Sequence, residues 1–552
     1  MESQRLILFF VFSFSLFLLL DAWQRDQQPV PAPSASVEKG AKPTAVAPPV
    51  PSDKLIAPAA PPAQSAPGTA LAQGETITVD TDVFRAEIST AGGDLRRLEL
   101  KQHAGRNQKS GNFVLFQSTP EHVYIAQSGL IGGDLPNHRT TYASPARSYT
   151  LGAGDQVLDV RLEAPPVREV KVTKIYRFHR DSYVIDVSYE IVNQGSTALA
   201  PFGYFQLVRD SEPPEGTSKM VPTFNGVAAY TEKDKFQKAP YDDIEKGKVP
   251  FPKTSNDGWI AMLQHYFFSA WLPKDGIQRE FYARHLQGDL YAAGVIVPIG
   301  NVAAGQAATV SVPLYAGPQE QEKLAKLAPG LELTVDYGWL TIIAVPLFWL
   351  LSWLHNWVGN WGVAVILLTI IIKLLFYPLS EAGYRSMAKM RVVAPKLQRL
   401  KEQYGDDRQR VQQAMMELYR TEKINPLGGC FPIIIQIPVF IALYWVLLAS
   451  VELRHSPFFG WIHDLSAPDP WFVLPILMGA TMIIQTRLNP EPPDPVQAKV
   501  MKIMPIAFSV FFFFFPAGLV LYWLVNNILS IAQQWHINRK LERANLVPAR
   551  KA

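Results

Sequence analysis

The chain has 552 residues, enough for two or three domains, and its formal net charge of +4 is small for this length. This charge gives no indication of direct nucleic-acid binding. The single cysteine, Cys430, excludes an intramolecular disulfide and a CxxC metal site. The chain contains no Walker loop, HExxH or GxSxG motif, so we expect no enzyme activity, no catalytic residue, no cofactor and no metal site.

Residues 1–26 predict an N-terminal anchor helix, because an apolar run extends from Leu6 to Leu20. The run has only 15 residues, which also fits a cleavable signal peptide. No small-x-small cleavage site follows it, and Trp23 suits the headgroup level, so we favour an uncleaved anchor. Residues 27–74 contain eleven prolines and predict an extended linker.

Residues 75–318 have the period-two hydrophobic pattern of β-strands. Runs that begin at Glu75, Lys171 and Ser182 show this pattern, and clusters of Gly, Pro, Asn and Asp separate such runs. We therefore expect an all-β antiparallel sandwich. No paired carboxylates or histidine cluster within it have a spacing typical of catalysis, so we expect a binding or spacing module.

The last part of the chain contains apolar runs that are typical of an α-helical membrane domain. Residues 319–360 predict linking and interfacial helices. The predicted spans after the anchor are the second at 361–378, the third at 426–451, the fourth at 471–487, and the fifth and sixth at 503–537. The last run exceeds the roughly 20 residues that cross the hydrocarbon, so we expect two helices joined by a tight turn at 516–518.

The basic residues predict the topology. Residues 379–425 contain ten Lys and Arg, and basic loops stay in the cytoplasm. The loop 488–502 and the tail 538–552 also carry basic residues, whereas the connection 452–470 has one Arg and no Lys. If the Trp-rich run 339–354 crossed the membrane, the most basic loop would fall outside, so we expect that run to lie in the interface. The prediction is six spans with a five-helix core, both termini inside and the β domain outside.

The loop 379–425 also predicts a cytoplasmic helical hairpin. Apolar residues recur at helical spacing on both sides of a turn at Gly405-Asp-Asp, and Met387, Met390 and Met415 lie among them. The two helices could pack on each other through these residues. Alternatively, the methionines could offer an adaptable surface to varied hydrophobic partners, because Met side chains change shape readily.

Polar residues within the predicted spans suggest a groove. The spans contain no Asp or Glu, and Lys373 is the only charged side chain well within one, although its long stem could let the ammonium reach the headgroups. Unpaired polar groups that face lipid are costly, so we expect the polar side chains to converge on a wetted cavity open to the cytoplasm. Besides Lys373, the candidates are Thr369, Gln436, Thr481, Gln485, Tyr522, Asn526 and Ser530.

The C-terminal part of the chain contains several motifs in a fixed order. They are Ser386-Met-Ala-Lys-Met-Arg, the Gly405-Asp-Asp turn, Asn425-Pro-Leu-Gly-Gly-Cys-Phe-Pro, Trp461-Ile-His-Asp-Leu-Ser and Pro516-Ala-Gly-Leu-Val-Leu-Tyr-Trp. These motifs resemble those of the bacterial YidC membrane protein insertases, whose wider family includes the mitochondrial Oxa and chloroplast Alb proteins. The resemblance covers essentially the whole chain, including the anchor, the linker and a large periplasmic β domain of the Gram-negative type.

The resemblance implies a chaperone that inserts nascent membrane proteins into the bacterial inner membrane. A groove in the inner leaflet would receive the polar tail of a client, attracted by a basic residue that is usually Arg and is Lys373 here. Thr369 matches the groove threonine. Tyr522 and Trp523 match an aromatic pair, one member of which contacts clients. The apolar part of the client would leave along the third and fifth spans into the membrane lipids.

The resemblance also implies partners. The periplasmic domain would be a β super-sandwich that resembles sugar-binding folds, and part of it would dock on the Sec translocon. Only about 15 residues follow the last span, so ribosome binding through the tail would be transient and weak. The exchange of Arg for Lys keeps the charge but loses the bidentate guanidinium.

Two other functions compete with insertion. Ion-coupled transporters generally use intramembrane carboxylates, and the predicted spans have none, which argues against a transporter or channel. A membrane-anchored carbohydrate-binding or cell-wall protein would place its function in the β domain. Deletion of most of that domain would separate this third hypothesis from insertion.

Overall fold

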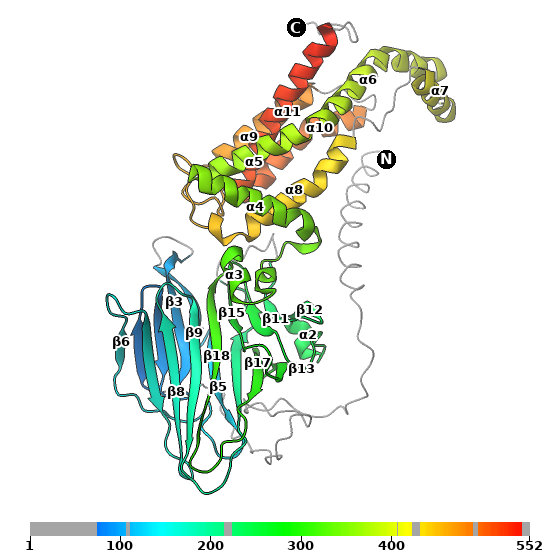
Figure 1. Ribbon diagram of the computed structural model, residues 1–552. Coiled ribbons are helices and arrows are strands. Elements are labelled where there is room, and N and C mark those ends of the chain that lie inside the picture. Colours follow the sequence, from blue (N-terminus) through cyan, green and yellow to red (C-terminus); the bar gives the residue numbers. More distant parts are fainter. Residues whose placement is uncertain are drawn as a thin grey trace. The chain divides into compact units, whose positions relative to one another are not determined.

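The computed structural model describes residues 74–105, 111–214, 223–405, 407–421, 431–488 and 495–543 (Figure 1). These residues form two compact units, a β-rich unit that ends at Asp336 and a helical unit that begins at Tyr337. The predicted anchor 1–26, the linker as far as residue 73, residues 422–430 and the tail from residue 544 lie outside the described residues.

The larger sheet of the β-rich unit has ten strands in the order β13-β16-β17-β10-β5-β4-β3-β2-β1-β6. Their bounds are β1 Thr76–Asp80, β2 Phe84–Ser89, β3 Asp94–Ala104, β4 Asn112–Ser118, β5 Val123–Ile131, β6 Ser148–Thr150, β10 Phe202–Asp210, β13 Thr254–Ser255, β16 Arg279–His285 and β17 Leu290–Pro298. The long central pairs are antiparallel, as in β10 with β5 and β17. The short edge strand β6 pairs with β1 in parallel, which departs from the antiparallel expectation.

The second sheet has eight strands in the order β12-β11-β14-β15-β18-β9-β8-β7. Their bounds are β7 Val157–Glu163, β8 Val170–His179, β9 Val184–Asn193, β11 Gly226–Thr231, β12 Lys235–Pro240, β14 Trp259–Leu263, β15 Phe267–Trp271 and β18 Ala307–Pro318, with the short helix α2 at Tyr241–Glu245. In β9 every second residue, from Ile185 to Ile191, is fully buried. This alternation is the period-two pattern seen in the sequence, and the predicted β-rich character of residues 75–318 is confirmed.

Side chains from both sheets meet in a shared core. The Tyr176 hydroxyl on β8 donates to the Gly93 carbonyl beside β3 at 2.6 Å, and Ser128 on β5 lies 2.9 Å from the Tyr189 hydroxyl on β9. Because these bonds join one sheet to the other, the two sheets pack face to face around them. Burial in this core raises the pKa of both tyrosine hydroxyls.

The core also contains two opposite charges, Lys174 on β8 and Asp94 at the start of β3, both without solvent exposure. The Lys174 ammonium donates to the Gly92 carbonyl at 3.2 Å and lies 5.3–5.9 Å from the ring centres of three tyrosines, Tyr142, Tyr176 and Tyr189. Burial raises the pKa of Asp94 to about 6 and lowers the pKa of Lys174 to about 8, although each charge favours the other. No pattern in the sequence indicated this pair.

The end of the β-rich unit is held against the second sheet. Helix α3, Gln321–Leu327, and the short 3₁₀ helix at Leu331–Thr334 follow β18. The Trp259 indole on β14 donates to the Pro329 carbonyl at 3.0 Å, and Lys238 on β12 forms an ion pair with Asp336. These contacts fix the chain just before the helical unit begins.

The helical unit has eight α-helices within its described residues. They are α4 Thr341–Val358, α5 Trp361–Leu375, α6 Tyr377–Tyr404, α7 Arg408–Thr421, α8 Phe431–Ala449, α9 Val473–Leu488, α10 Pro495–Phe511 and α11 Ala517–Arg543. Helix α11 packs against α5, α6, α8 and α9, whereas α4 packs against α5 and α8 (Figure 1). Because α11 contacts four other helices, it is the element around which the polar residues of the unit can meet.

Local sequence explains where several of these helices begin and end. Helix α4 ends at Gly359, whose φ of +69° favours glycine, and the Asn360 side chain then caps α5 by accepting from the Val363 N–H at 3.1 Å. Helices α5 and α6 meet at Phe376 with a bend of 63°. Helix α10 begins at Pro495, ahead of the apolar run expected from residue 503.

By length and composition, Gly338–Val358 is the one helix in the described part of the chain that could cross a membrane alone. The bent pair Trp361–Leu375 and Tyr377–Ala388 adds a second if its two halves count as one span. The apolar helices Ile435–Ala449 and Val473–Leu488 are shorter. The six spans expected from the sequence therefore stay a prediction.

Candidate functional site

The lysine predicted to carry the groove charge lies on the inner face of α5. The Lys373 side chain is only 6% exposed, and its ammonium donates to the Ser530 hydroxyl on α11 at 2.8 Å. That hydroxyl donates in turn to the Asn526 carbonyl one turn earlier, at 2.7 Å. The Gln533 amide on α11 donates to the Lys373 carbonyl at 3.2 Å. The cation is therefore held by a hydroxyl group within the helical unit.

A second polar contact joins α8 to the same face of α11. The Gln436 amide donates to the Asn526 side-chain oxygen at 2.9 Å. One turn earlier on α11, the Tyr522 ring is nearly fully buried and stacks on Phe440 of α8, with ring centres 5.9 Å apart. The neighbouring Trp523 meets Phe440 edge-on at 4.4 Å. The predicted residues on α5, α8 and α11 thus come together at one place.

The remaining predicted residues are arranged differently. Thr369 is buried on α5, and its hydroxyl donates to the Val365 carbonyl of its own helix at 2.6 Å. Thr481 on α9 donates to the Met478 carbonyl at 2.7 Å, and Gln485 is half-buried on the same helix. The threonines therefore satisfy their own hydroxyl protons within one helix, as buried Thr residues in helices commonly do.

Two polar residues of α11 that the sequence analysis left out face α9. Asn527 is 5% exposed with its amide 3.5 Å from the Thr481 hydroxyl, and Gln534 is 2% exposed and donates to the Leu488 carbonyl at 3.4 Å. Each is the second member of an Asn-Asn or Gln-Gln pair in the sequence. Because adjacent helix residues point about 100° apart, such a pair serves two neighbouring helices. The repeated amide residue was therefore a sequence signal that could have identified Asn527 and Gln534.

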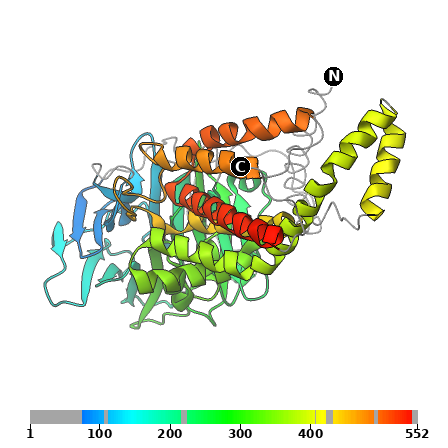
Figure 2. The same cartoon turned by 90° about the horizontal axis from the view of Figure 1, so that it is seen from above.

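The methionines predicted to bind clients lie on α6 and α7, which pack on each other as a hairpin (Figure 2). Met387, Met390 and Met415 are half-buried, whereas Met416 is 55% exposed. Part of the methionine surface is therefore buried in the helical unit, and part of it is exposed.

The connection between α8 and α9 is fastened to the start of α11. Asp469 is 1% exposed and accepts from the Trp461 indole at 2.9 Å and from the Leu474 N–H, in the first turn of α9, at 2.7 Å. The backbone N–H groups of Ala517 and Gly518 donate to carbonyls of this connection at 2.7 and 2.9 Å. These bonds fix the end of α11 that is remote from Lys373.

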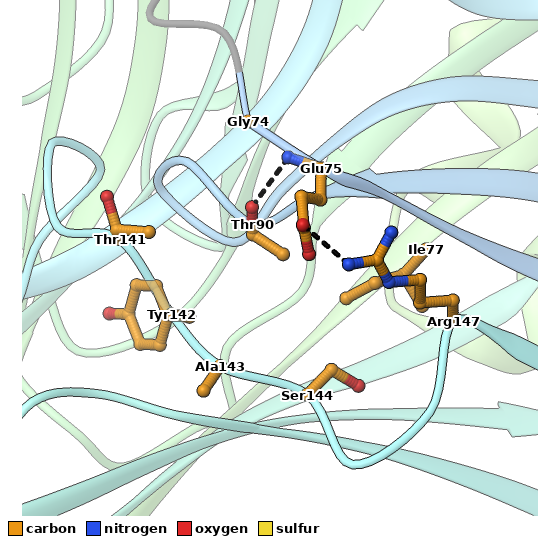
Figure 3. Close-up of a pocket in the computed structure, with 9 residues that line it drawn as sticks. All are labelled: Gly74, Glu75, Ile77, Thr90, Thr141, Tyr142, Ala143, Ser144 and Arg147. Atoms are coloured by element: carbon orange, nitrogen blue, oxygen red, sulfur yellow. Dashed lines mark hydrogen bonds and ion pairs between the residues drawn. The ribbon is translucent and has the colours of Figure 1, made fainter.

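The β-rich unit contains a separate hollow of about 490 Å³ beside the start of β1 (Figure 3). Arg147 and Glu75 form an ion pair at 2.5 Å, and the Glu75 N–H donates to the Thr90 hydroxyl at 2.8 Å. The ion pair fastens the start of the first strand to the loop before β6, and the bond to Thr90 fastens it to the end of β2. Over the described residues as a whole, no group of three or more His, Cys, Asp or Glu is placed to hold a metal ion.

Comparisons with known proteins agree over the whole chain. The family model of the YidC periplasmic domain matches residues 76–350, and that of the 60Kd inner membrane protein matches residues 353–544. The Nitrosospira multiformis protein named Membrane protein insertase YidC is 56% identical over 100% of both chains. The protein of the same name from Methylobacillus flagellatus is 58% identical over 99% of this chain and 98% of its own.

Solved structures with lower similarity were also found. A structure titled "Active YidC insertase crystal structure with the first transmembrane domain resolved" is 19% identical, covers 84% of this chain and 92% of its own, and has a TM-score of 0.40. A galactose mutarotase-like protein from Lactobacillus casei covers 44% of this chain and 99% of its own, with 11% identity and a TM-score of 0.28. The family models and the full-length identities decide the assignment: the chain belongs to the YidC family of membrane protein insertases.

Proposed function

We propose that this chain inserts integral membrane proteins into the bacterial inner membrane and helps them to fold, alone or with the Sec translocon. The observation that carries the groove mechanism is the buried Lys373 ammonium, which donates to the Ser530 hydroxyl of α11. One turn away, Asn526 of α11 is bonded to the Gln436 amide of α8. The predicted spans contain no Asp or Glu, so the sequence supplies no carboxylate there to neutralise this cation. Full-length relatives that are named insertases support the same activity.

The proposed mechanism needs only electrostatics and hydrophobic transfer. An acidic group in the translocated tail of a client is attracted to Lys373, and the attraction is stronger where protein and lipid replace water. Polar side chains such as Gln436 and Asn526 exchange their mutual hydrogen bond for bonds to the client backbone. The apolar segment then enters the lipid, which is favourable by several kcal/mol for a mostly apolar helix.

We further propose the six-span topology, with both termini and the α6–α7 hairpin in the cytoplasm. The ten basic residues at 379–425 support this orientation. Helix α4 would lie along the periplasmic interface: Phe348, Leu351 and Leu354 are buried within the helical unit, whereas three tryptophans on the other side are exposed, namely Trp349, Trp353 and Trp357. Tryptophans are enriched at the headgroup level, which supports a lipid contact there.

The proposed partners follow from the same arrangement. The exposed Met416 beside Met415 supports client contact on the hairpin, since methionine adapts to varied apolar surfaces. The β-rich periplasmic domain would dock on the Sec translocon. Contact with the ribosome would be transient.

Site-specific photo-crosslinking to a stalled nascent membrane protein tests the groove. Probes at Gln436, Tyr522 and Thr369 should crosslink to the client. A probe at Ile528 is the matched control, because this residue lies on the same helix as Tyr522 and is 49% exposed on a different face. Crosslinks from Ile528 alone, or equally from all four positions, would overturn the proposed location of the groove.

A further inference from the structure

We propose that Ser530 is a positioning residue that holds the Lys373 ammonium at a fixed place beside α11, where it can attract the acidic group of a client. This inference rests on the proposed groove function and assigns a role to a second side chain within it. The residue does not itself supply charge. It acts through Lys373.

The direction of the hydrogen bonds defines this role. A serine hydroxyl has one proton, and that of Ser530 is donated to the Asn526 carbonyl at 2.7 Å. The hydroxyl lone pairs are therefore directed away from α11 and accept from the Lys373 ammonium at 2.8 Å. An ammonium has three N–H donors, and Ser530 accepts one of them. The remaining donors can bind a client carboxylate without loss of the Ser530 contact.

The position of Lys373 explains why its ammonium needs such a partner. Its flexible stem allows the ammonium to move toward the headgroups near a helix end, and Lys373 lies only two residues before α5 ends at Leu375. The next two residues, Leu374 and Leu375, are 65% and 72% exposed, so Lys373 lies at the edge of the packed interior. The bond to Ser530 opposes movement of the charge out of the groove.

Most helix contacts beside Ser530 are made by other groups. The Gln533 amide donates to the Lys373 carbonyl at 3.2 Å and so joins α5 to α11 through the backbone. The Gln436–Asn526 bond joins α8 to α11. Tyr384 of α6 also interacts with the Ser530 hydroxyl. Ser530→Ala removes the hydroxyl partner of both the Lys373 ammonium and Tyr384. The helices stay joined, because Gln533 and Asn526 still bond α11 to α5 and α8, and Tyr384 and Ala388 of α6 still pack against Ile537 and Leu541 of α11.

Ser450 offers a matched control. It is 1% exposed at the end of α8, and its hydroxyl donates to the Val446 carbonyl four residues earlier, the same internal bond that Ser530 makes. Ser450→Ala therefore removes an equally buried hydroxyl that has no contact with Lys373. Ser530→Thr serves as the conservative variant, since it keeps a hydroxyl at the same place.

The test compares full-length variants in proteoliposomes with two clients that differ only in acidic or neutral residues of the translocated tail. Ser530→Ala should lower insertion of the acidic client by about tenfold or more, in line with the loss of a hydrogen bond to a charged group, and leave the neutral client unchanged. Ser530→Thr and Ser450→Ala should insert both clients like the original chain. Acylation of Lys373 by a membrane-permeant amine reagent, measured by mass spectrometry, should rise severalfold in Ser530→Ala only.

The outcomes separate this inference from the proposed function. If Ser530→Ala impairs both clients equally and leaves the acylation of Lys373 unchanged, the residue is structural and the inference is wrong. If Lys373→Ala removes the preference for the acidic client while Ser530→Ala preserves it, the groove charge stands and the positioning role fails. If Lys373→Ala leaves the preference intact, the groove charge itself is wrong.

Discussion

Gln436 of α8 and Asn526 of α11 are hydrogen-bonded at 2.9 Å, amide to amide, within the apolar surroundings of the helical unit. The backbone carbonyl of Asn526 also accepts a hydrogen bond from the Ser530 hydroxyl. Asn526 is therefore bonded both to Gln436, which joins α8 to α11, and to Ser530, which holds the Lys373 ammonium. A polar segment that entered the proposed groove would meet these groups already paired with one another, so it would have to replace existing hydrogen bonds.

This pairing predicts a measurable coupling. In a double-mutant cycle with Gln436→Leu and Asn526→Leu, the coupling free energy should be about 0.6 kcal/mol and at most about 1.7 kcal/mol, the range for such bonds within membranes. The measurement is reversible unfolding of the full-length chain in bicelles. Additive effects of the two substitutions would show that the bond does not stabilise the helical unit.

The charge of Lys373 predicts a client-dependent effect. Lys373→Arg should insert clients normally, because the charge is kept, whereas Lys373→Ala should weaken insertion of clients with acidic translocated tails. Insertion is scored by protease protection of the translocated tail. Normal insertion of the same clients by Lys373→Glu would show that the groove charge is irrelevant.

We predict that the chain keeps its function when most of the β-rich domain is deleted. Because the residues of the proposed groove all lie beyond residue 336, strains depleted of the protein should still be rescued by a chain that lacks most of residues 76–318 but keeps α3 and the helical unit. Growth after depletion is the measurement, and membrane localisation of the shortened chain is the control. Failure of a correctly localised chain would favour a function within the β domain.

The buried Asp94 predicts an unusual pH dependence in the β-rich unit. Burial raises its pKa from 3.8 to about 6, so the folded state binds this proton more tightly than the unfolded state. The stability due to this proton is present below about pH 4 and is lost as the pH rises through about 6. We expect hydrogen-exchange protection of β3 and β8, measured on the full chain, to reflect this contribution.

Other carboxylates, such as Asp159 beside Arg177, have lowered pKa values and act in the opposite direction. The informative quantity is therefore the difference between the original chain and Asp94→Asn. Only the original chain should show the gain in protection between about pH 6 and pH 4. Identical pH profiles for the two chains would contradict the assignment.

The contacts of Asp469 predict that it stabilises the helical unit. Asp469→Ala removes the cap of α9 and leaves the Trp461 indole without its acceptor, which should cost about 2 kcal/mol. Asp407→Ala is the control, since Asp407 caps α7 at the surface by accepting from the Arg410 N–H and should cost less. Equal unfolding free energies for both variants, from denaturation in detergent, would contradict this role.

Several elements of the fold followed directly from local patterns. The alternation in β9, the end of α4 at Gly359 and the start of α5 after Asn360 depend on neighbouring residues alone. Partners far apart in the chain did not follow. The bond between Lys373 and Ser530 joins residues 157 positions apart, and the Asp94–Lys174 pair required knowledge of which strands face each other.

The sequence alone determined that the chain has a β-rich domain followed by apolar helices, and that one cation and several polar residues lie within those helices. Hydrophobic periodicity records which faces are buried, because burial is repeated along each element. Only the tertiary structure decided which partner each polar group has. It placed Ser530, rather than Thr369, against the ammonium of Lys373. It also directed the two members of each amide pair of α11 to different neighbouring helices. A hydrogen bond depends on distance and direction between side chains, and neither quantity is contained in spacing along the chain.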